Sequence, residues 1–342
     1  MRIGAIVPSS IAAAIVVGVS GGAVAQDLPA DFFRGKTITI LVGLSPGGNY
    51  DLYARLIARH IGRHVPGNPA VIVRNQPGAG GRTMLNQLYA AGPLDGTAIG
   101  LANQGVAQDQ ALGDKGLKVD TRRLAWLGSP IDEVNVAWVW HTSPIKSIEM
   151  AKSRDVVVGA TGPSSPTFTT PRILNALIGT RFKVVSGYPG STEIDRAIEA
   201  GELDGRAAVG WSSLKITHDW VAAKKAVVLV QFGLRRAPDL PSVPLLQELA
   251  TNDRDRGILE FLALGPAMGR PFCLPPGVPE NRVAALRTAF EAALKDPALL
   301  KDAATGRLEI NPVGYSQLEQ LARRALSMPE TSLDVLRTAM KK

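Results

Sequence analysis

The sequence predicts an α/β protein with two lobes of strand–helix units around a cleft. Its 342 residues are enough for two domains of roughly 150 residues each. Short apolar, β-branched runs alternate along the chain with helical patterns, and turns rich in Gly and Pro separate them. Strands that alternate with helices in this way predict parallel sheets with right-handed crossovers.

The first lobe begins with the run TITILV at Thr37–Val42, a continuous apolar stretch typical of a strand that is buried on both faces. Apolar residues then recur at helical spacing from Leu52 and predict an amphipathic helix to about His64. Further strands of this lobe are predicted at Ala70–Val73, Ala98–Ala102 and Leu124–Leu127, with a helix at Thr83–Ala91. The next strand, at Val134–Trp140, follows this lobe.

The second lobe repeats this pattern. Strands are predicted at Asp155–Gly159, Phe182–Val185, Leu203–Val209 and Ala226–Phe232, and helices at Arg172–Ile178, Glu193–Ala200 and about Ser213–Ala223. Thr192 and Asp195 have the spacing of an N-terminal cap for the second of these helices. Three more helical patterns follow near the C-terminus, at Glu280–Leu294, Tyr315–Leu326 and Thr331–Ala339.

These units predict how the chain is divided. Residues 26–132 form the first part of domain I, residues 133–237 form domain II, and residues 238–342 return to domain I with the C-terminal helices. The chain then crosses between the lobes twice, near Ile131–Val139 and near Pro238–Leu264. Two lobes connected in this way form a hinge-closing trap with a ligand cleft between them.

The first 25 residues have the features of a secretory signal peptide. Arg2 precedes an apolar run from Ile11 to Val19, and Ala23-Val24-Ala25 forms a small-x-small cleavage site. The alternative interpretation is a membrane anchor, but the apolar run is shorter than the roughly 18 residues that a membrane span needs. We therefore expect cleavage after about Ala25 and a mature protein in the periplasm.

Composition and motifs exclude several functional classes. One cysteine and four histidines cannot supply a zinc-ribbon or iron–sulfur framework. The formal charge of +8 is not gathered into a basic and aromatic stripe, which argues against nucleic-acid binding. The chain contains no dinucleotide fingerprint, P-loop lysine or nucleophile elbow. We expect no catalytic residues, no cofactor and no metal site, and the protein is not predicted to be an enzyme.

Four turns follow predicted strands and are rich in Gly, Pro and Ser, at residues 45–48, 76–81, 161–165 and 186–190. In parallel sheets the loops at the carboxyl ends of strands surround the ligand crevice. The helix after each turn directs unpaired N–H groups and a partial positive charge toward that crevice, so an anion is the favoured ligand. The alternative is that Gly and Pro act here only as ordinary turn formers.

Three motifs carry a resemblance to a known family. They are Pro46-Gly47-Gly48-Asn49-Tyr50-Asp51, Asn75-Gln76-Pro77-Gly78-Ala79-Gly80-Gly81 and Asp95-Gly96. Their order and spacing resemble those of the tripartite tricarboxylate transporter receptors, also called Bug proteins, and residues 240–249 and 275–290 extend the resemblance. Members of this family are periplasmic substrate-binding proteins with a type II periplasmic-binding fold.

The resemblance implies that two turns close like a pincer on a ligand carboxylate, with backbone groups and ordered waters doing much of the binding. The residues implied on one side are Ser45, Gly47, Gly48 and Asp51, with Gly80 and Gly81 beside them, and those on the other side are Thr161, Ser164, Ser165, Thr167 and Thr170. Thr169-Thr170-Pro171 replaces a histidine that the family often has. Gly210-Trp211 stands where an acidic residue is often found, and Trp211 either stacks on the ligand or packs in the core.

The resemblance further implies a receptor that captures a small organic carboxylate and delivers it to the membrane permease of a tripartite tricarboxylate-type transporter. We expect it to act as a monomer without nucleic acid. A sensor that presents its closed form to a membrane signalling partner would have the same sequence features, because the partner surface has no motif. Neighbouring genes for a permease or for a histidine kinase would distinguish the two functions.

Overall fold

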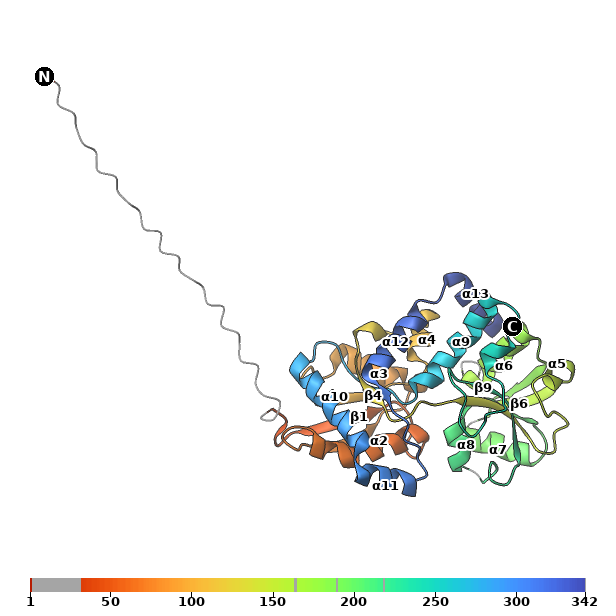
Figure 1. Cartoon of the computed structure of the whole chain (residues 1–342), viewed down its shortest axis with the longest axis horizontal. Coiled ribbons are helices and arrows are strands. Elements are labelled where there is room, and N and C mark those ends of the chain that lie inside the picture. Colours follow the sequence, from red (N-terminus) through yellow and green to blue (C-terminus); the bar gives the residue numbers. More distant parts are fainter. Residues whose placement is uncertain (2–31, 163–164, 189, 218, 342) are drawn as a thin grey trace.

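The computed structural model describes residue 1 and residues 32–162, 165–188, 190–217 and 219–341. These residues form two lobes that lie side by side, each built on one β-sheet (Figure 1). The predicted α/β fold with two lobes is confirmed. The predicted signal peptide, apart from Met1, lies outside the described residues. Within the described ranges, no helix is both long enough and apolar enough to cross a membrane.

The first sheet has six strands in the order β11-β4-β10-β3-β1-β2 across the described residues. They are β1 (Thr37–Val42), β2 (Ala70–Asn75), β3 (Ala98–Leu101), β4 (Ala125–Ser129), β10 (Phe272–Leu274) and β11 (Val313–Gly314). Strand β1 is parallel to β2 and β3, whereas β10 runs antiparallel to β3 and β4, and β11 runs antiparallel to β4. Only the part of this sheet made by β1, β2 and β3 therefore has the parallel pairing that the sequence predicts.

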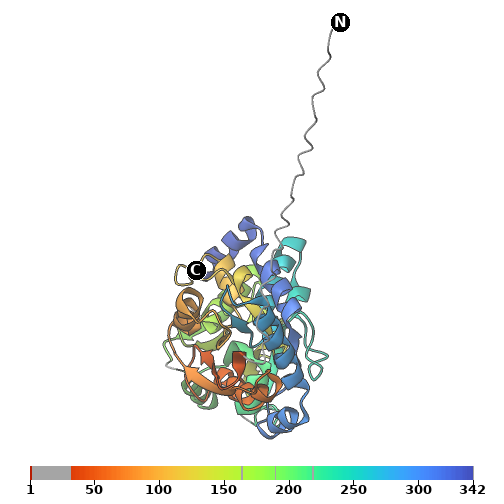
Figure 2. The ribbon, with the colours of Figure 1, turned by 90° about the vertical axis from the view of Figure 1, so that its left-hand side faces the viewer.

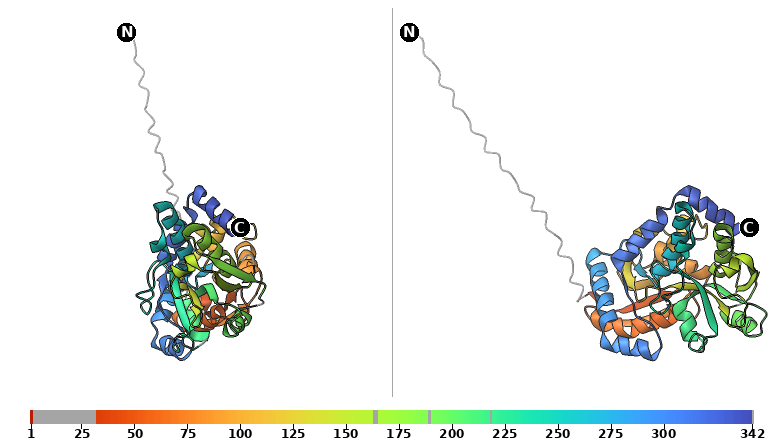
Figure 3. Two further views of the ribbon diagram at one scale, coloured as in Figure 1. Left: turned by 90° about the vertical axis from the view of Figure 1, so that its right-hand side faces the viewer. Right: turned by 45° about the vertical axis from the view of Figure 1, so that its right-hand side comes forward.

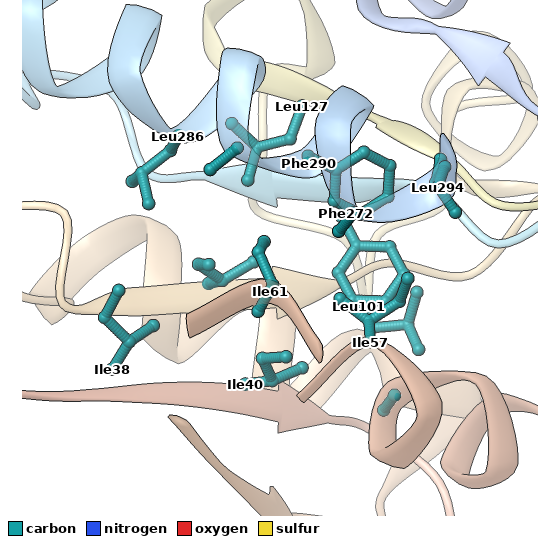
Figure 4. Packing of buried hydrophobic residues seen from close by; sticks show 14 of the residues in the cluster. Ile38, Ile40, Ile57, Ile61, Leu101, Leu127, Phe272, Leu286, Phe290 and Leu294 are labelled. Carbon is teal, nitrogen blue, oxygen red and sulfur yellow. The ribbon is translucent and has the colours of Figure 1, made fainter. Parts of the chain in front are cut away.

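Helices cover both faces of the first sheet (Figure 2). One face packs against α2 (Asn49–Ile61), α10 (Glu280–Lys295) and α11 (Pro297–Thr305), and the opposite face against α3 (Arg82–Ala91), α4 (Val106–Ala111) and α12 (Tyr315–Leu326). Short 3₁₀ turns lie at Gly62–His64, Ala79–Gly81 and Thr121–Arg123. Figure 4 shows the core on the α2 side, where Ile40, Ile57 and Phe290 come from three different elements.

The second sheet has five described strands in the order β7-β6-β8-β5-β9. They are β5 (Asn135–Trp140), β6 (Val156–Ala160), β7 (Phe182–Ser186), β8 (Gly205–Gly210) and β9 (Ala226–Phe232). The helices of this lobe are α5 (Met150–Ser153), α6 (Pro166–Ile178), α7 (Ser191–Glu199) and α8 (Trp211–Thr217). Figure 3 shows this lobe end-on, and β5 runs antiparallel to both of its neighbours.

Chain segments cross between the lobes at two places. Residues 130–134 connect β4 of the first sheet to β5 of the second. The return passes through the 3₁₀ turn Leu246–Leu249 and helix α9 (Asp253–Met268) before β10. Leu246 packs in the core of the second sheet. This contact favours a return of the chain to the first lobe later than at residue 238. The boundaries of the two domains remain a prediction.

Helix α9 was not predicted, because a Gly-Pro pair near its end (Gly265-Pro266) interrupts the helical pattern. Its first turn is capped by Asn252, whose side chain accepts a hydrogen bond from the Asp255 amide. Leu259 of α9 packs in the core of the second sheet, while Phe261 packs in that of the first. The last helix, α13 (Glu330–Lys341), packs on α6 of the other lobe. Helices thus connect the lobes in addition to the crossing segments.

Two local predictions were wrong. Strand β1 is not buried on both faces, because Ile38, Ile40 and Val42 are buried while Thr37 is exposed and Thr39 is half-buried. The alternating threonines were the signal of a half-covered face. Asp195 does not cap α7, since the N-cap residue Gly190 has no side-chain partner and the Asp195 carboxylate bonds Arg206 at 2.9 Å.

Candidate functional site

The turn after β1 is held in place by a buried carboxylate. Asp51 is only 2% exposed, and it accepts hydrogen bonds from the Gly47 amide at 2.9 Å, from Arg55 Nε at 2.9 Å and from Asn75 Nδ2 at 3.0 Å. Burial raises the pKa of this carboxyl, but the hydrogen bonds from Arg55, Gly47 and Asn75 outweigh it and hold the pKa below its usual value. Asp51 is therefore ionised and positions the turn, and its placement does not support the predicted contact with a ligand.

The beginning of α2 offers the hydrogen-bond donors of this side. Gly48 is its N-cap, with φ −78° and ψ 168°, and no side chain caps the helix there. The first-turn amides of Asn49 and Tyr50 have no partner within a helix of this geometry, and the helix dipole adds positive potential. Ser45, Gly47 and Gly48 are exposed beside them. Of the predicted residues, Gly48 lies at the donor face, whereas the Gly47 amide is already used by Asp51.

The second glycine-rich turn, at residues 76–81, packs against Gly43, which lies just before the first turn. Gly80 and Gly81 have φ values of +66° and +94°, which favour glycine. Gly81 is buried against Gly43, where an added Cβ on Gly43 would lie 2.4 Å from the Gly81 Cα. Close approach of two backbones thus explains these glycines. Gly80 is exposed and Gly81 supports the first turn from behind.

The opposite side, at the start of α6, uses most of its donors internally. Ser165 is the N-cap residue of α6, but its side chain does not cap the helix. Its hydroxyl donates instead to the Gly162 carbonyl at 2.8 Å. The amides of Phe168 and Thr169 both donate to the Ser165 carbonyl at 3.0 Å, and Pro166 has no N–H. Thr167 is half-buried, and its hydroxyl bonds the Ser165 hydroxyl at 2.9 Å. Its backbone amide remains as a possible donor to a ligand.

The other predicted residues of this side are placed differently. Thr161 is half-buried at the end of β6, and Thr170 is a buried residue of α6, at 7% exposure. Ser164 lies outside the described residues. The structure therefore brings Thr161, Ser165 and Thr167 to the start of α6, while Thr170 lies in the helix packing.

Trp211 packs in the core of the second lobe. It is 5% exposed, belongs to a cluster with Trp138 and Trp220, and donates from Nε1 to both carboxylate oxygens of Asp239 at 3.0 Å. Lys215 pairs with the same carboxylate at 2.8 Å. These contacts favour packing over stacking on a ligand.

The start of α8 is occupied by an internal carboxylate. Glu133, from the segment that connects β4 to β5, accepts the Ser212 amide at 3.2 Å and also bonds the Ser212 hydroxyl. Arg270 pairs with Glu133 at 3.2 Å between Nη2 and Oε2, and the two side chains are 4% and 2% exposed. The pair connects the segment before β10 with the first crossing, at the junction of the two lobes.

Arg270 also reaches the first turn of α2. Its guanidinium lies 4.6 Å from the ring centroid of Tyr50 and donates to Gln104 Oε1 at 3.2 Å. The Tyr50 hydroxyl accepts the Gln104 amide at 3.0 Å, and burial raises the pKa of this phenol. Tyr50, Gln104, Arg270 and Glu133 thus form one polar network. This network was not predicted from the sequence, although Arg270 is an isolated charge within an apolar stretch.

The two lobes touch where α2 meets α8. Asn49 Nδ2 donates to Ser213 Oγ at 2.6 Å, and Ile216 of α8 packs against the core of the first lobe. The Oδ1 of Asn49 is buried without a hydrogen-bond partner among the described residues, and so is that of Asn135. Asn135 is 6% exposed and lies opposite Gly210 in the sheet register, beside the start of α8. Two unsatisfied amide oxygens therefore lie near this contact.

Among the described residues, His60, His64 and Cys273 show no arrangement of a reactive site. His60 and His64 bond two different carboxylates, Asp302 and Asp296, each at 2.9 Å. In the described part of the chain, no group of three potential metal ligands occurs. Cys273 is fully buried, and burial raises the pKa of its thiol to about 12, so it is not a nucleophile at neutral pH.

Similar sequences extend over nearly the whole chain, although no family model matches it. A UPF0065 protein from Cupriavidus necator is 24% identical over 95% of this chain and 94% of its own length. A second UPF0065 protein, from Pseudomonas sp. strain P51, is 25% identical over 79% of this chain and 77% of its own.

Solved structures share the fold. A TctC solute-binding protein from Polaromonas superposes with a TM-score of 0.67 at 16% identity, over 90% of this chain and 99% of its own. The periplasmic binding protein BugD gives 0.65 at 18%, over 90% and 98%. MatC from Rhodopseudomonas palustris, solved with malate, gives 0.64 at 20%, over 89% and 100%.

The two sheets and the segments that connect them have the fold of solved periplasmic solute-binding proteins. The motifs, the similar sequences and the shared fold agree. The resemblance of this chain to the Bug (TctC) family of tricarboxylate-type receptors is confirmed.

Proposed function

We propose that this protein is an exported, monomeric receptor that captures a small organic carboxylate where its two lobes meet and delivers it to a tripartite tricarboxylate-type permease. The observation that carries the proposal is the uncapped N-terminus of α2, which Asp51 and Asn75 hold at the contact between the lobes. An exposed, uncapped helix N-terminus favours an anion. Two structural neighbours were solved with malate and with adipate, both of them dicarboxylates.

Magnitudes indicate which further groups must contribute. Each hydrogen bond to a charged group is worth about 1.5–3 kcal/mol, so four donors give a gross of roughly 6–12 kcal/mol. Association costs at least about 4 kcal/mol, and micromolar affinity needs a net of about −8 kcal/mol. The backbone donors of α2 reach a net of about −8 kcal/mol only if each hydrogen bond has the upper value and association has the lowest cost. We therefore expect further donors to bind the ligand as well, namely the Thr167 backbone amide and the Nδ2 groups of Asn49 and Asn135.

The contact between the lobes sets how the ligand enters. Asn49 bonds Ser213 across the junction, so opening must break this bond before a ligand can reach the start of α2. A ligand then replaces it with contacts to both lobes. This is the hinge closure expected for a trap of this architecture.

The test compares two glycine variants. Gly48→Val places a branched side chain at the proposed donor face, and apart from the Ser45 carbonyl at 3.7 Å nothing is near the new Cβ. Gly314→Val is the matched control, because Gly314 is also an uncapped helix N-cap, with φ −70°, and has open space around it. It lies on β11, four strand positions and thus roughly 19 Å from β1.

Calorimetry with malate, adipate and a panel of related acids measures the affinity. We expect Gly48→Val to weaken binding at least about tenfold, which corresponds to one hydrogen bond to a charged group, and Gly314→Val to leave it within about twofold. Circular dichroism checks that both variants fold. Unchanged affinity in Gly48→Val, or no saturable binding of any acid in the panel, would remove the proposal. Loss of ligand uptake on deletion of the gene tests delivery to a permease.

A further inference from the structure

Tyr50 belongs to the motif at residues 46–51, but the carboxylate site described above uses only its backbone amide. Tyr50 is the second residue of α2, after the N-cap Gly48, and its side chain is half-buried. Backbone donors bind a ligand well only when the surrounding chain holds them in the productive orientation. The contacts that hold this first turn therefore affect the affinity of the site.

Two contacts fix the side chain of Tyr50. Its ring lies over the guanidinium of Arg270, 4.6 Å from the ring centroid, and its hydroxyl accepts the Gln104 amide at 3.0 Å. Gln104 lies in the loop between β3 and α4, and its Oε1 accepts a hydrogen bond from Arg270 Nη1 at 3.2 Å. Tyr50, Gln104 and Arg270 therefore form a triangle in which each residue contacts the other two.

Arg270 is itself anchored where the chain crosses between the lobes. Its amide donates to Ser129 Oγ at 2.8 Å, and its side chain pairs with Glu133 of the first crossing at 3.2 Å. The preceding residue, Gly269, has a φ of +63°, and a Cβ added there would lie 1.7 Å from the Ile131 carbonyl oxygen. The backbones of the two crossing segments thus touch directly beside Arg270.

The start of α2 consequently has two separate anchors. Asp51 accepts the Gly47 amide and the Asn75 side chain, and it holds the turn that precedes the helix. Tyr50 holds the first turn of the helix itself against Arg270. A change at the Tyr50 side chain leaves the contacts of Asp51 in place, so it should alter the orientation of the donor amides without removing the turn.

We infer that Tyr50 is a positioning residue, whose side chain acts through Arg270 to hold the first turn of α2 against the crossing segments. The effect on a ligand rests on the proposed function, whereas the anchoring itself is independent of any ligand. A contact between an aromatic ring and a desolvated guanidinium corresponds to about fivefold to thirtyfold in an equilibrium constant. Loss of the ring should therefore change both the opening of this turn and the affinity by a factor of this size.

Three variants separate the ring of Tyr50 from its hydroxyl. Tyr50→Leu removes the ring, whereas Tyr50→Phe keeps the ring on Arg270 and removes only the hydroxyl. Arg270→Lys keeps a positive charge beside Glu133 but loses the planar group that stacks on the ring. Tyr315→Leu is the matched control, because Tyr315 also begins a helix after an uncapped glycine, and its ring centroid lies 3.8 Å from the Arg287 guanidinium.

Hydrogen exchange of the ligand-free protein measures the anchoring directly. The Leu52 amide donates to the Gly48 carbonyl at 3.0 Å, so its exchange rate reports how often the first turn of α2 opens. We expect this rate to rise about fivefold to thirtyfold in Tyr50→Leu and in Arg270→Lys. It should stay within about threefold of the wild type in Tyr50→Phe, which keeps the ring contact, and in Tyr315→Leu.

Calorimetry with malate and adipate measures the consequence for a ligand. Affinity should fall by a similar factor in Tyr50→Leu, recover in Tyr50→Phe and stay unchanged in Tyr315→Leu. Unchanged Leu52 exchange in both Tyr50→Leu and Arg270→Lys, or equal damage in Tyr50→Phe and Tyr50→Leu, would overturn the role of the ring. Faster exchange with unchanged affinity in Tyr50→Leu would overturn the positioning of the ligand. If neither acid binds while Leu52 exchange responds as expected, the proposed function fails and the anchoring by Tyr50 stands.

Discussion

The buried pair of Arg270 and Glu133 should be among the most sensitive positions of the molecule. Glu133→Gln keeps the shape of the side chain but removes its charge. The Arg270 guanidinium then remains buried, 3% exposed, with Gln104, the Gly269 carbonyl and the Tyr50 ring as neighbours and without a counter-ion. Glutamine also presents a donor where Glu133 now accepts from Ser212 and Val134.

The expected cost follows from this geometry. Removing one partner of a buried ion pair costs about 3–5 kcal/mol, because the other charge stays uncompensated. At about 2–4 °C per kcal/mol for a lobe-sized unit, the melting temperature should fall by roughly 6–20 °C. Removing both charges, in Glu133→Gln/Arg270→Met, should cost less than the sum of the single variants by about 2 kcal/mol.

Urea unfolding followed by circular dichroism measures these free energies. The control is Lys295→Gln, which breaks the pair of Lys295 and Glu291, whose side chains are 72% and 71% exposed; it should cost no more than about 0.5 kcal/mol. A cost below about 1 kcal/mol for Glu133→Gln, or additive costs in the double variant, would refute the view that this pair is a buried, coupled unit between the lobes.

Two other predictions concern Trp211 and Asp109. Trp211→Phe should lower the free energy of unfolding by about 1–3 kcal/mol, because the hydrogen bonds to Asp239 are lost. The ligand affinity measured by calorimetry should stay within about threefold. A large loss of affinity would instead favour the interpretation that Trp211 stacks on the ligand. Burial raises the pKa of Asp109 to about 6, although Arg82 opposes this, so the wild type binds a proton more tightly when folded and loses stability as pH rises from about 4 to 6. Asp109→Asn should therefore gain stability relative to the wild type over this range. The gain should be only about 1 kcal/mol, because the Asp109 side chain is 30% exposed. Denaturant unfolding of both proteins at pH 4 and pH 7 measures it, and a difference in stability that does not change with pH would contradict the prediction.

Much of the fold could be predicted from periodicity. The strands at Thr37–Val42 and Ala226–Phe232 and the helix at Tyr315–Leu326 begin and end where the apolar patterns predict. Local patterns fail where the partner is distant. β10 has only three residues, Phe272–Leu274, and is a strand because it inserts between β3 and β4. Its pairing depends on the return of the chain from the other lobe, which no local pattern reports.

The candidate site divides in the same way. The motif around Gly48 located the start of α2, because the turn and the helix are local. The roles of individual side chains were less accessible: the motif did not indicate that Asp51 bonds Gly47, Arg55 and Asn75 and so positions the turn. Whether a side chain faces a crevice or a core depends on what packs beside it.

The amino-acid sequence by itself determined the alternation of strands and helices, the glycine-rich turns and the family resemblance, since each rests on residues within a few positions of one another. Only the tertiary structure decided that β5, β10 and β11 run antiparallel, that Glu133 occupies the start of α8 and that Arg270 lies beside Tyr50. Arg270 and Glu133 are 137 residues apart in the chain, and the energy of burying two opposite charges together exists only once folding has brought them into contact.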